Sequence, residues 1–210
     1  MKKNYKRTLI ITCMVTLLPM LAGILLWDKL PDTIATHFGS DNTANGWSSK
    51  PFAVFGLPLF LAAAQLFSFF LISADPKKKN INEKFFTWIL WIIPAVSCVT
   101  CLSCYGIALG MKINIGTCMY ILGGAMFILI GNYMHKVKQN YTVGIKLPWT
   151  LNSEENWNRT HRMASWLWII AGIILILNSF LRIDWILIAA ILLSVVIPIG
   201  YSYMLFRKGI

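Results

Sequence analysis

Long apolar stretches alternate with short polar ones along the whole chain. Six of the apolar stretches reach the roughly 20 residues that a helix needs to cross the hydrocarbon core of a bilayer. They cover residues 8–27, 52–73, 85–109, 113–134, 163–181 and 185–206. The pattern therefore predicts an all-α fold, that of a polytopic integral membrane protein with six transmembrane helices.

Composition places the chain in the same class. Hydrophobic residues make up 57% of its 210 residues and charged residues only 13%, whereas a soluble domain of this length needs a far more charged surface. The basic residues ahead of the first stretch resemble the start of a secretory signal. Because the apolar run is long and no small-x-small cleavage site closes it, we expect an uncleaved first helix.

The basic residues predict the orientation in the membrane. Fifteen of the 19 Lys and Arg residues lie at the two termini, between the second and third stretches, and between the fourth and fifth, while the other gaps hold four. Cytoplasmic loops carry such an excess, so both termini are predicted to be cytoplasmic. The net charge of +11 then reflects topology and contact with the anionic lipid bilayer, and direct binding of nucleic acid is not expected.

We expect three parts along the chain. Residues 1–75 are predicted to form an N-terminal two-helix membrane unit with an outer loop at 28–50. Residues 76–112 hold the third helix and its connections. Residues 113–210 are predicted to form a three-helix unit with a cytoplasmic loop at 135–162.

Small residues within the spans are predicted to serve packing. Cys98, Cys101 and Cys104 repeat at three-residue steps on an apolar helix with no fourth ligand nearby, so we predict packing and no bound metal. Cys104 and Cys118 flank a short outer turn, and the sequence does not decide whether they form a disulfide. Close helix packing is also expected at the glycines of the third and fourth stretches: Gly106, Gly110, Gly123 and Gly124.

The spans lack the ionisable residues that ion-coupled transport usually needs, since all eight acids lie in loops or at span edges. A carrier or channel for a small or lipidic substrate, built from backbone groups or helix ends, is the alternative function. No nucleophile, P-loop or zinc-protease motif occurs, so we predict no enzyme, no catalytic residues and no cofactor. A membrane enzyme at the inner surface, with His161 and Glu154 or Glu155 as acid–base groups, is a third hypothesis.

The outer loop holds the first group of candidate residues. Phe38 and Trp47 are apolar side chains in a polar stretch, and His37 and Lys50 lie beside them in sequence. The two aromatic rings either anchor the loop at the helix ends or present a surface to an apolar ligand. A single histidine with scattered carboxylates is a weak signal for a metal site, and none is predicted here.

The second group lies in the predicted cytoplasmic loop. Gly144 permits a sharp turn, and Pro148 favours an extended Leu147 before it. Asn152, followed three residues later by Glu155, predicts a helix start. The segment 154–162 can then run as a helix on the membrane surface and lead into the fifth span, with Trp149 and Trp157 at the depth of the lipid headgroups.

At this point the sequence resembles a known family, the SdpI family. The resemblance rests on Gly131-Asn132-Tyr133-Met134, Asn140, Gly144-Ile145-Lys146-Leu147-Pro148-Trp149-Thr150-Leu151, Trp157 and Thr160-His161-Arg162. The outer segment resembles the small membrane domain of unknown function that often precedes this signature, through Leu30-Pro31, His37-Phe38, Gly46 and Ser49-Lys50. The family pattern usually has Arg and Thr where this chain has Lys146 and Leu147; the lysine keeps the positive charge but lacks the planar fork that bidentate contacts need.

The resemblance implies an integral membrane immunity protein that protects a bacterium against a secreted, membrane-active killing-factor peptide. In the best-known member, the toxin-bound protein also sequesters a small cytoplasmic repressor. An extracellular antimicrobial peptide and such a repressor are therefore the expected partners. The outer loop is expected to contact the peptide, with candidates His37, Phe38, Trp47 and Lys50. The inner signature is expected to support the fold or signalling, with candidates Asn132, Asn140, Gly144, Lys146, Pro148, Trp149, Thr150, Trp157, His161 and Arg162.

Overall fold

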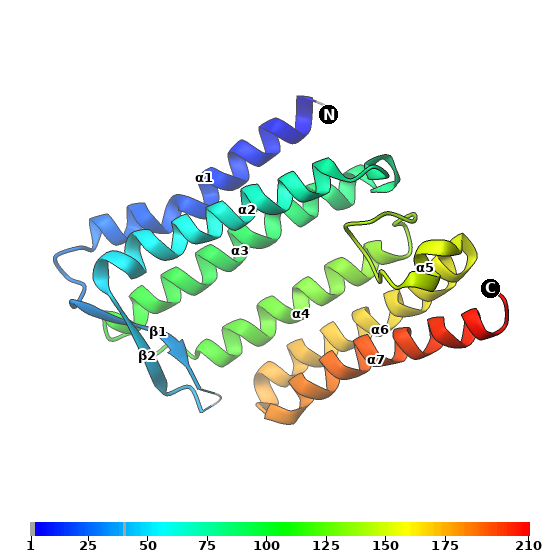
Figure 1. Cartoon of the computed structure of the whole chain (residues 1–210). Helices are drawn as coiled ribbons and strands as arrows, with labels where there is room; N and C mark the ends of the chain where they lie inside the picture. The colour runs from blue at the N-terminus through cyan, green and yellow to red at the C-terminus, as the bar shows by residue number, and fades with distance from the viewer. Residues whose placement is uncertain (1–2, 40) are drawn as a thin grey trace. The chain divides into compact units, whose positions relative to one another are not determined.

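The computed structural model describes residues 3–39 and 41–210, and its main elements are six long helices (Figure 1). They are α1 (Lys3–Leu25), α2 (Leu57–Ala74), α3 (Glu83–Ala108), α4 (Ile115–Met134), α6 (Glu154–Leu181) and α7 (Asp184–Arg207). A π-helical turn, Phe52–Gly56, runs directly into α2, and a 3-10 turn, Lys78–Asn80, precedes α3. All six long helices are long and apolar enough to cross a membrane. The prediction of six spans is confirmed.

The fifth span begins earlier than predicted. α6 is one continuous helix from Glu154 to Leu181, so the helix expected over 154–162 is present and runs without a break into the fifth span. Its N-cap is Ser153, whose hydroxyl accepts from the backbone N–H of Asn156. Asn152, the predicted cap, instead ends a short helix, α5 (Pro148–Asn152), that the sequence did not predict. Since Ser caps as well as Asn, the helix simply begins one residue later.

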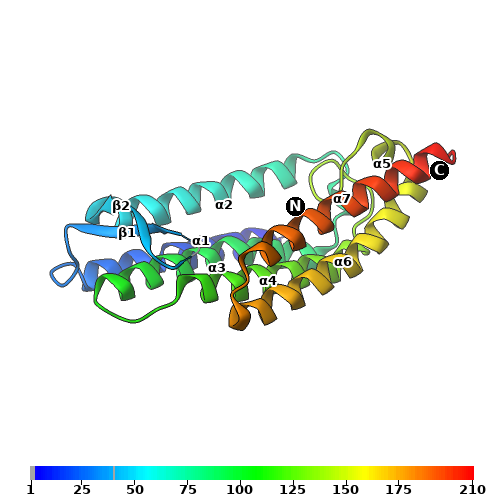
Figure 2. The same ribbon diagram turned by 90° about the horizontal axis from the view of Figure 1, so that it is seen from below.

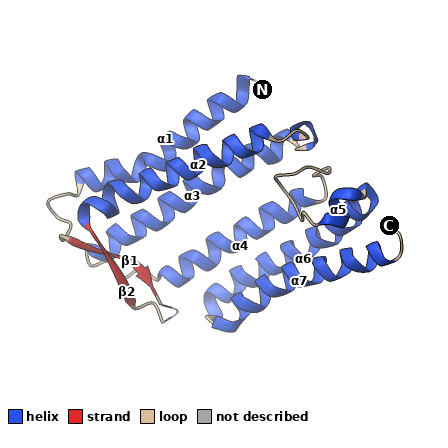
Figure 3. Ribbon diagram, viewed as in Figure 1, coloured by secondary structure: helices blue, strands red, loops and turns tan. Residues whose placement is uncertain are grey.

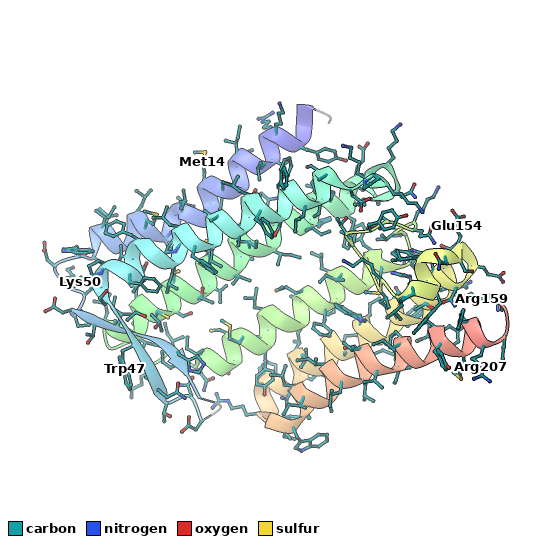
Figure 4. All side chains as sticks on the ribbon, viewed as in Figure 1. Met14, Trp47, Lys50, Glu154, Arg159 and Arg207 are labelled. Carbon is teal, nitrogen blue, oxygen red and sulfur yellow. The ribbon has the colours of Figure 1, made fainter. Side chains whose placement is uncertain are left out.

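The apolar side chains of the long helices face mostly outward. No span has more than 39% of its most apolar window buried within the protein. Met14 on α1 is an example, pointing away from the ribbon with 64% of its surface exposed (Figure 4). Because a helix satisfies its own backbone groups, such a surface is stable against hydrocarbon.

Contacts divide the chain into two compact units. The first is Met1–Phe69 with Ile89–Met119, and the second is Phe70–Trp88 with Tyr120–Ile210. The boundaries fall inside α2, α3 and α4, because the two parts of each of these helices pack with different neighbours. The sequence-based division at residues 75 and 112 stays a prediction.

The first unit carries an antiparallel hairpin that the hydropathy pattern did not predict (Figure 3). Strand β1 (Thr33–Phe38) pairs with β2 (Ala44–Ser49), and the register shifts around His37. Ile34 is fully buried in a cluster with Leu30, Val54 and Tyr105. The hairpin is therefore fixed to the helix ends through its first strand.

Buried polar groups tie the helices of the first unit together. The Gln65 amide donates to the Thr12 hydroxyl at 3.0 Å and to the Leu90 carbonyl at 2.8 Å. The Ser97 hydroxyl donates to the Thr16 carbonyl at 2.7 Å. Such bonds hold membrane helices together where lipid supplies no hydrophobic drive.

The cysteines carry free thiols, Cys104 and Cys118 included. Cys101 and Cys104 are buried beside Tyr105 in the cluster that holds Ile34. No group of potential metal ligands occurs within residues 3–39 and 41–210.

In the second unit, α4 and α6 approach each other at their glycines. A Cβ on Gly124 would lie 2.6 Å from the Gly172 carbonyl oxygen, and one on Gly131 would lie 2.9 Å from the Ser165 oxygen. α6 and α7 lie side by side in both views (Figures 1 and 2). The expected close packing is found at Gly124. Gly110, in contrast, adopts a positive φ of 85° just after α3 and serves as a turn residue.

We expect Gly124→Ala to lower the stability of the protein by about 1–3 kcal/mol, because the added methyl forces α4 and α6 apart. Gly123→Ala is the matched control, since a Cβ there meets nothing within 4 Å. Thermal unfolding in detergent measures both. Equal melting temperatures for the two variants would contradict the close approach of α4 and α6 at Gly124.

Candidate functional site

The buried carboxylate of Asp75 joins the α2–α3 connection to the segment after α4. One carboxylate oxygen accepts from the Lys77 backbone N–H at 2.7 Å. The other accepts from the Tyr141 N–H at 2.9 Å and from the Thr142 hydroxyl at 2.7 Å. Hydrogen bonds to a carboxylate are among the stronger ones in proteins. Asp75 thus fixes the start of what we call the polar segment, residues 135–162.

Gln139 makes a second connection in the same place. Its side-chain oxygen accepts from the Lys77 ammonium at 2.7 Å. Its amide donates to the carbonyls of Thr150 and Leu151, at 3.0 and 2.8 Å. The Gln139 backbone carbonyl accepts from the Asn80 amide at 2.7 Å. One buried glutamine therefore links the α2–α3 connection to α5.

Asn140 folds the chain on itself. Its side-chain oxygen accepts from the N–H groups of Thr142 and Val143, and its amide donates to the carbonyls of Lys138 and Val143. The side chain is fully buried, and both of its polar atoms are paired. This is an asparagine-built turn, in which the side chain replaces a regular backbone partner.

Gly144, Trp157 and His161 form the centre of the polar segment. Gly144 has φ of 126°, and a Cβ there would lie 2.5 Å from Nε2 of His161 and 2.9 Å from the Trp157 ring. The His161 ring stacks on Trp157 at 4.0 Å between centroids, and the Trp157 indole N–H donates to the Val137 carbonyl. Only glycine fits both the backbone angle and the space.

Both ring nitrogens of His161 have partners. Nδ1–H donates to the Trp157 carbonyl at 2.8 Å, and Nε2 accepts from the Ile145 N–H at 2.9 Å. This pattern requires the neutral imidazole, because Nε2 carries no proton. The His161 ring therefore connects α6 to the Gly144 turn through these two hydrogen bonds.

Thr150 and Trp149 attach α5 on two sides. The Thr150 hydroxyl accepts from the Leu147 N–H at 2.9 Å and lies 2.8 Å from the Ile145 carbonyl, to which it donates. The Trp149 indole donates to the Ser202 hydroxyl on α7, and its ring packs against Tyr203 and Phe206. The short helix is thus held against α7.

The predicted signature residues fall into two groups. Asn140, Thr150, Trp157 and His161 are at most 1% exposed, and Trp149 is half-buried. Trp157 is therefore not an anchor at the headgroup depth, as predicted, but part of the protein interior. The exposed members are Asn132, Gly144, Lys146, Pro148 and Arg162.

Two of the exposed members come together. Asn132, near the end of α4, and Arg162, on α6, line one open cavity of about 550 Å³. His135, Asn158, Ser165, Trp166 and Ile169 complete its lining. Lys146 is separate from this cavity, and its ammonium donates to the Thr142 carbonyl at 3.0 Å.

The four residues predicted to contact a peptide, on or next to the hairpin, differ in their exposure and in their partners. Trp47 on β2 is 62% exposed (Figure 4). Lys50 is held by Asp32 at 3.3 Å and lies over the Trp27 ring at 5.3 Å. Phe38 packs on the buried cluster of the first unit and also lines an open cavity of about 460 Å³. His37 bonds to the Asn45 side chain across the hairpin.

Sequence reasoning missed Asp75 and Gln139, which organise the polar segment. The available signal was weak: Asp75 is a lone acid where an apolar stretch meets a run of lysines. Asn156 was also missed. Its buried amide donates to the carbonyls of Ser202 and Ile210, joining α6 to α7 and the C-terminus.

We expect Asp75→Asn to loosen the start of the polar segment, because asparagine offers one accepting oxygen where three donors now share two. Loss of a hydrogen bond to a charged group costs about 1.5–3 kcal/mol. The amides of residues 141–143 should therefore exchange with deuterium about tenfold faster or more. Asp28→Asn, at an exposed position, is the control. Unchanged exchange in Asp75→Asn would show that the carboxylate does not hold the segment.

Comparisons with known proteins now add to this geometry. Residues 136–202 match the model of the SdpI/YfhL protein family, and residues 14–62 match a domain of unknown function (DUF1648). The chain is 30% identical over 219 residues to the Immunity protein SdpI of Bacillus subtilis (strain 168). The match covers 99% of this chain and 98% of that relative. No solved structure matches it.

The likeness extends over nearly the whole of both chains, and it includes the hairpin, the polar segment and the spans. With six helices suited to crossing a bilayer, this is a multi-pass protein of the bacterial cell membrane. The chain belongs to the SdpI/YfhL protein family.

Proposed function

We propose that the protein is an immunity protein, which protects the cell against a membrane-active killing-factor peptide. The observation that carries this proposal is the nearly full-length similarity to a relative named Immunity protein SdpI. A match restricted to one segment would support a shared module. A match from end to end supports a shared task as well as a shared fold.

The hairpin is the proposed contact for the peptide. Ile34 fixes β1 to the core, and Lys50 fixes the end of β2 to Asp32 and Trp27. Trp47 is exposed on the hairpin that these contacts hold in place. A rigid aromatic side chain supplies a large contact area at a low cost in conformational entropy, and tryptophan is enriched at binding hot spots. An amphipathic peptide offers the matching apolar surface.

The cavity lined by Phe38 is the proposed second contact. It also involves Asn42 and the 107–114 segment that joins α3 to α4, where Met111 is 60% exposed and Lys112 is exposed. An apolar residue of the peptide would fit against Phe38 and Met111. His37 acts by holding the hairpin through Asn45.

The polar segment is the proposed signalling end. Three spans separate it in sequence from the hairpin, so the two lie on opposite sides of the membrane if each helix crosses. A small cytoplasmic repressor would then bind the exposed part of this segment, around Lys146 and Pro148. Such signalling requires that the protein has two conformational states. The peptide and the repressor must each bind one of these states more tightly than the other.

A catalytic role is not proposed. His161, the base in the enzyme hypothesis, is buried with both nitrogens engaged. Glu154 is exposed on the first turn of α6, and Glu155 pairs with Arg159 at 2.6 Å. The three groups therefore do not converge on a substrate.

We expect Trp47→Ala to lower protection at least severalfold when the protein is expressed in a strain sensitive to the killing-factor peptide. The minimal peptide concentration that stops growth measures this. Trp185→Ala is the matched control, because Trp185 is 67% exposed at the start of α7 but lies outside the hairpin. Immunity to that peptide is refuted if the parent gives no protection, and the hairpin site is refuted if Trp47→Ala protects fully.

We expect Lys146→Ala to weaken recruitment of a repressor to the membrane. The measurement is the membrane-bound fraction of a fluorescent fusion of a candidate repressor, a small helix-turn-helix protein of the same bacterium, with and without peptide. Lys138→Ala, also exposed in the polar segment, is the control. If the regulator stays in the cytoplasm with the parent protein and peptide present, the signalling part of the proposal fails while immunity stands.

A further inference from the structure

The open cavity between the end of α4 and the first half of α6 has a polar end and an apolar end. Asn132 and His135 come from the α4 end, while Asn158, Arg162, Ser165, Trp166 and Ile169 come from α6. The lining contains no acidic residue. Its volume of about 550 Å³ is within the range of small-molecule sites.

The polar end offers donors that have no partner within the described chain. No hydrogen bond or ion pair in residues 3–39 and 41–210 engages the side chains of Asn132, Asn158 or Arg162. Arg159, one turn before Arg162, is paired with Glu155 instead. Two amides and a guanidinium therefore open into one space, and a guanidinium matches a phosphate with two parallel hydrogen bonds.

The electrostatic field at this end is positive. The pKa of His135 lies below its usual value, because of partial desolvation of the ring and then because of the nearby charges of Lys136 and Arg162. His135 Nδ1 is 3.3 Å from the Ser165 hydroxyl, which itself donates to the Gly131 carbonyl. An anion in the cavity would offset this positive charge.

The other end of the cavity matches lipid chains. Asn158, Arg162, Trp166 and Ile169 follow one another at three- or four-residue steps, so they share one face of α6. Trp166 is 66% exposed and follows Arg162 by one turn. Tryptophan favours the depth of the lipid headgroups, and the aliphatic side chain of Ile169 is suited to contact an acyl chain. Along α6 the lining thus changes from a charged group through an aromatic ring to an aliphatic side chain, in the direction in which a phospholipid changes from phosphate to acyl chain.

We propose that this cavity binds an anionic phospholipid, with the phosphate at Arg162, Asn132 and Asn158 and the first acyl carbons along Trp166 and Ile169. This goes beyond immunity and does not depend on it. The lipid would hold the end of α4 to α6 next to the polar segment. It would also give several residues of the signature region a ligand inside the membrane.

Native mass spectrometry of the full chain in mild detergent tests this, with phosphatidylglycerol or phosphatidylcholine added. The parent should retain one phosphatidylglycerol in preference to phosphatidylcholine. Arg162→Gln should lower the affinity for phosphatidylglycerol about tenfold, as expected for the loss of a charge-assisted hydrogen bond. Arg159→Gln should behave like the parent, because Arg159 lies outside the cavity and is engaged by Glu155.

Further variants distinguish a bound phospholipid from a bound phosphate or peptide. Asn158→Glu places a carboxylate in the cavity and should lower retention as much as Arg162→Gln, so the test does not rest on the folding of one variant. Trp166→Ala should weaken the binding of phosphatidylglycerol but not of glycerol phosphate. The proposal is overturned if both lipids are retained equally, if Arg162→Gln and Asn158→Glu both retain phosphatidylglycerol like the parent, or if inorganic phosphate alone displaces it. An acidic peptide that displaces the lipid at equal concentration would also overturn it.

Discussion

Asp75 is the residue on which the second unit depends. An irregular segment beside a membrane needs partners for its backbone groups, since lipid provides none. The Asp75 carboxylate supplies them for Tyr141 and Lys77, and Gln139 extends the same link to α5. In the same segment, the Gly144 turn lies against Trp157 and His161. Together these contacts explain why a loop of this length can be compact.

The hydrogen bonds around Asp75 and Gln139 separate the family-signature residues into two groups with different roles. Residues such as Asn140, Thr150 and His161 have all of their polar capacity used inside the protein, so they serve the shape of the segment. Exposed residues of the same signature, Arg162 and Asn132 among them, are available to a ligand. A substitution in the buried group would weaken function by disturbing the fold. A substitution in the exposed group would weaken function by removing a contact with the ligand. Stability measurements therefore have to accompany any activity measurement on this segment.

Much of the fold could be predicted from hydropathy, because each span is a local pattern that a bilayer requires. The turn at Gly144 and the extended Leu147 were also predicted, since both follow from properties of single residues. The β1–β2 hairpin and the burial of Trp157 were not. Each depends on contacts between residues distant in sequence, such as Ile34 with Tyr105 or Trp157 with Val137. Hydropathy alone cannot distinguish a tryptophan at the headgroups from one inside the protein.

The position where this chain departs from the usual family pattern now has a physical meaning. Leu147 is the N-cap of α5, and its side chain makes no capping hydrogen bond. A threonine there would supply one, which is worth about 1 kcal/mol at a helix start. In this chain the Thr150 hydroxyl holds the Leu147 N–H from the other direction, and Gln139 binds the carbonyls of Thr150 and Leu151. The ammonium of Lys146, next to it, donates to the Thr142 carbonyl, and the side chain is exposed, so its charge remains at the surface. In this chain α5 is therefore supported by the buried network and not by a side-chain cap at Leu147.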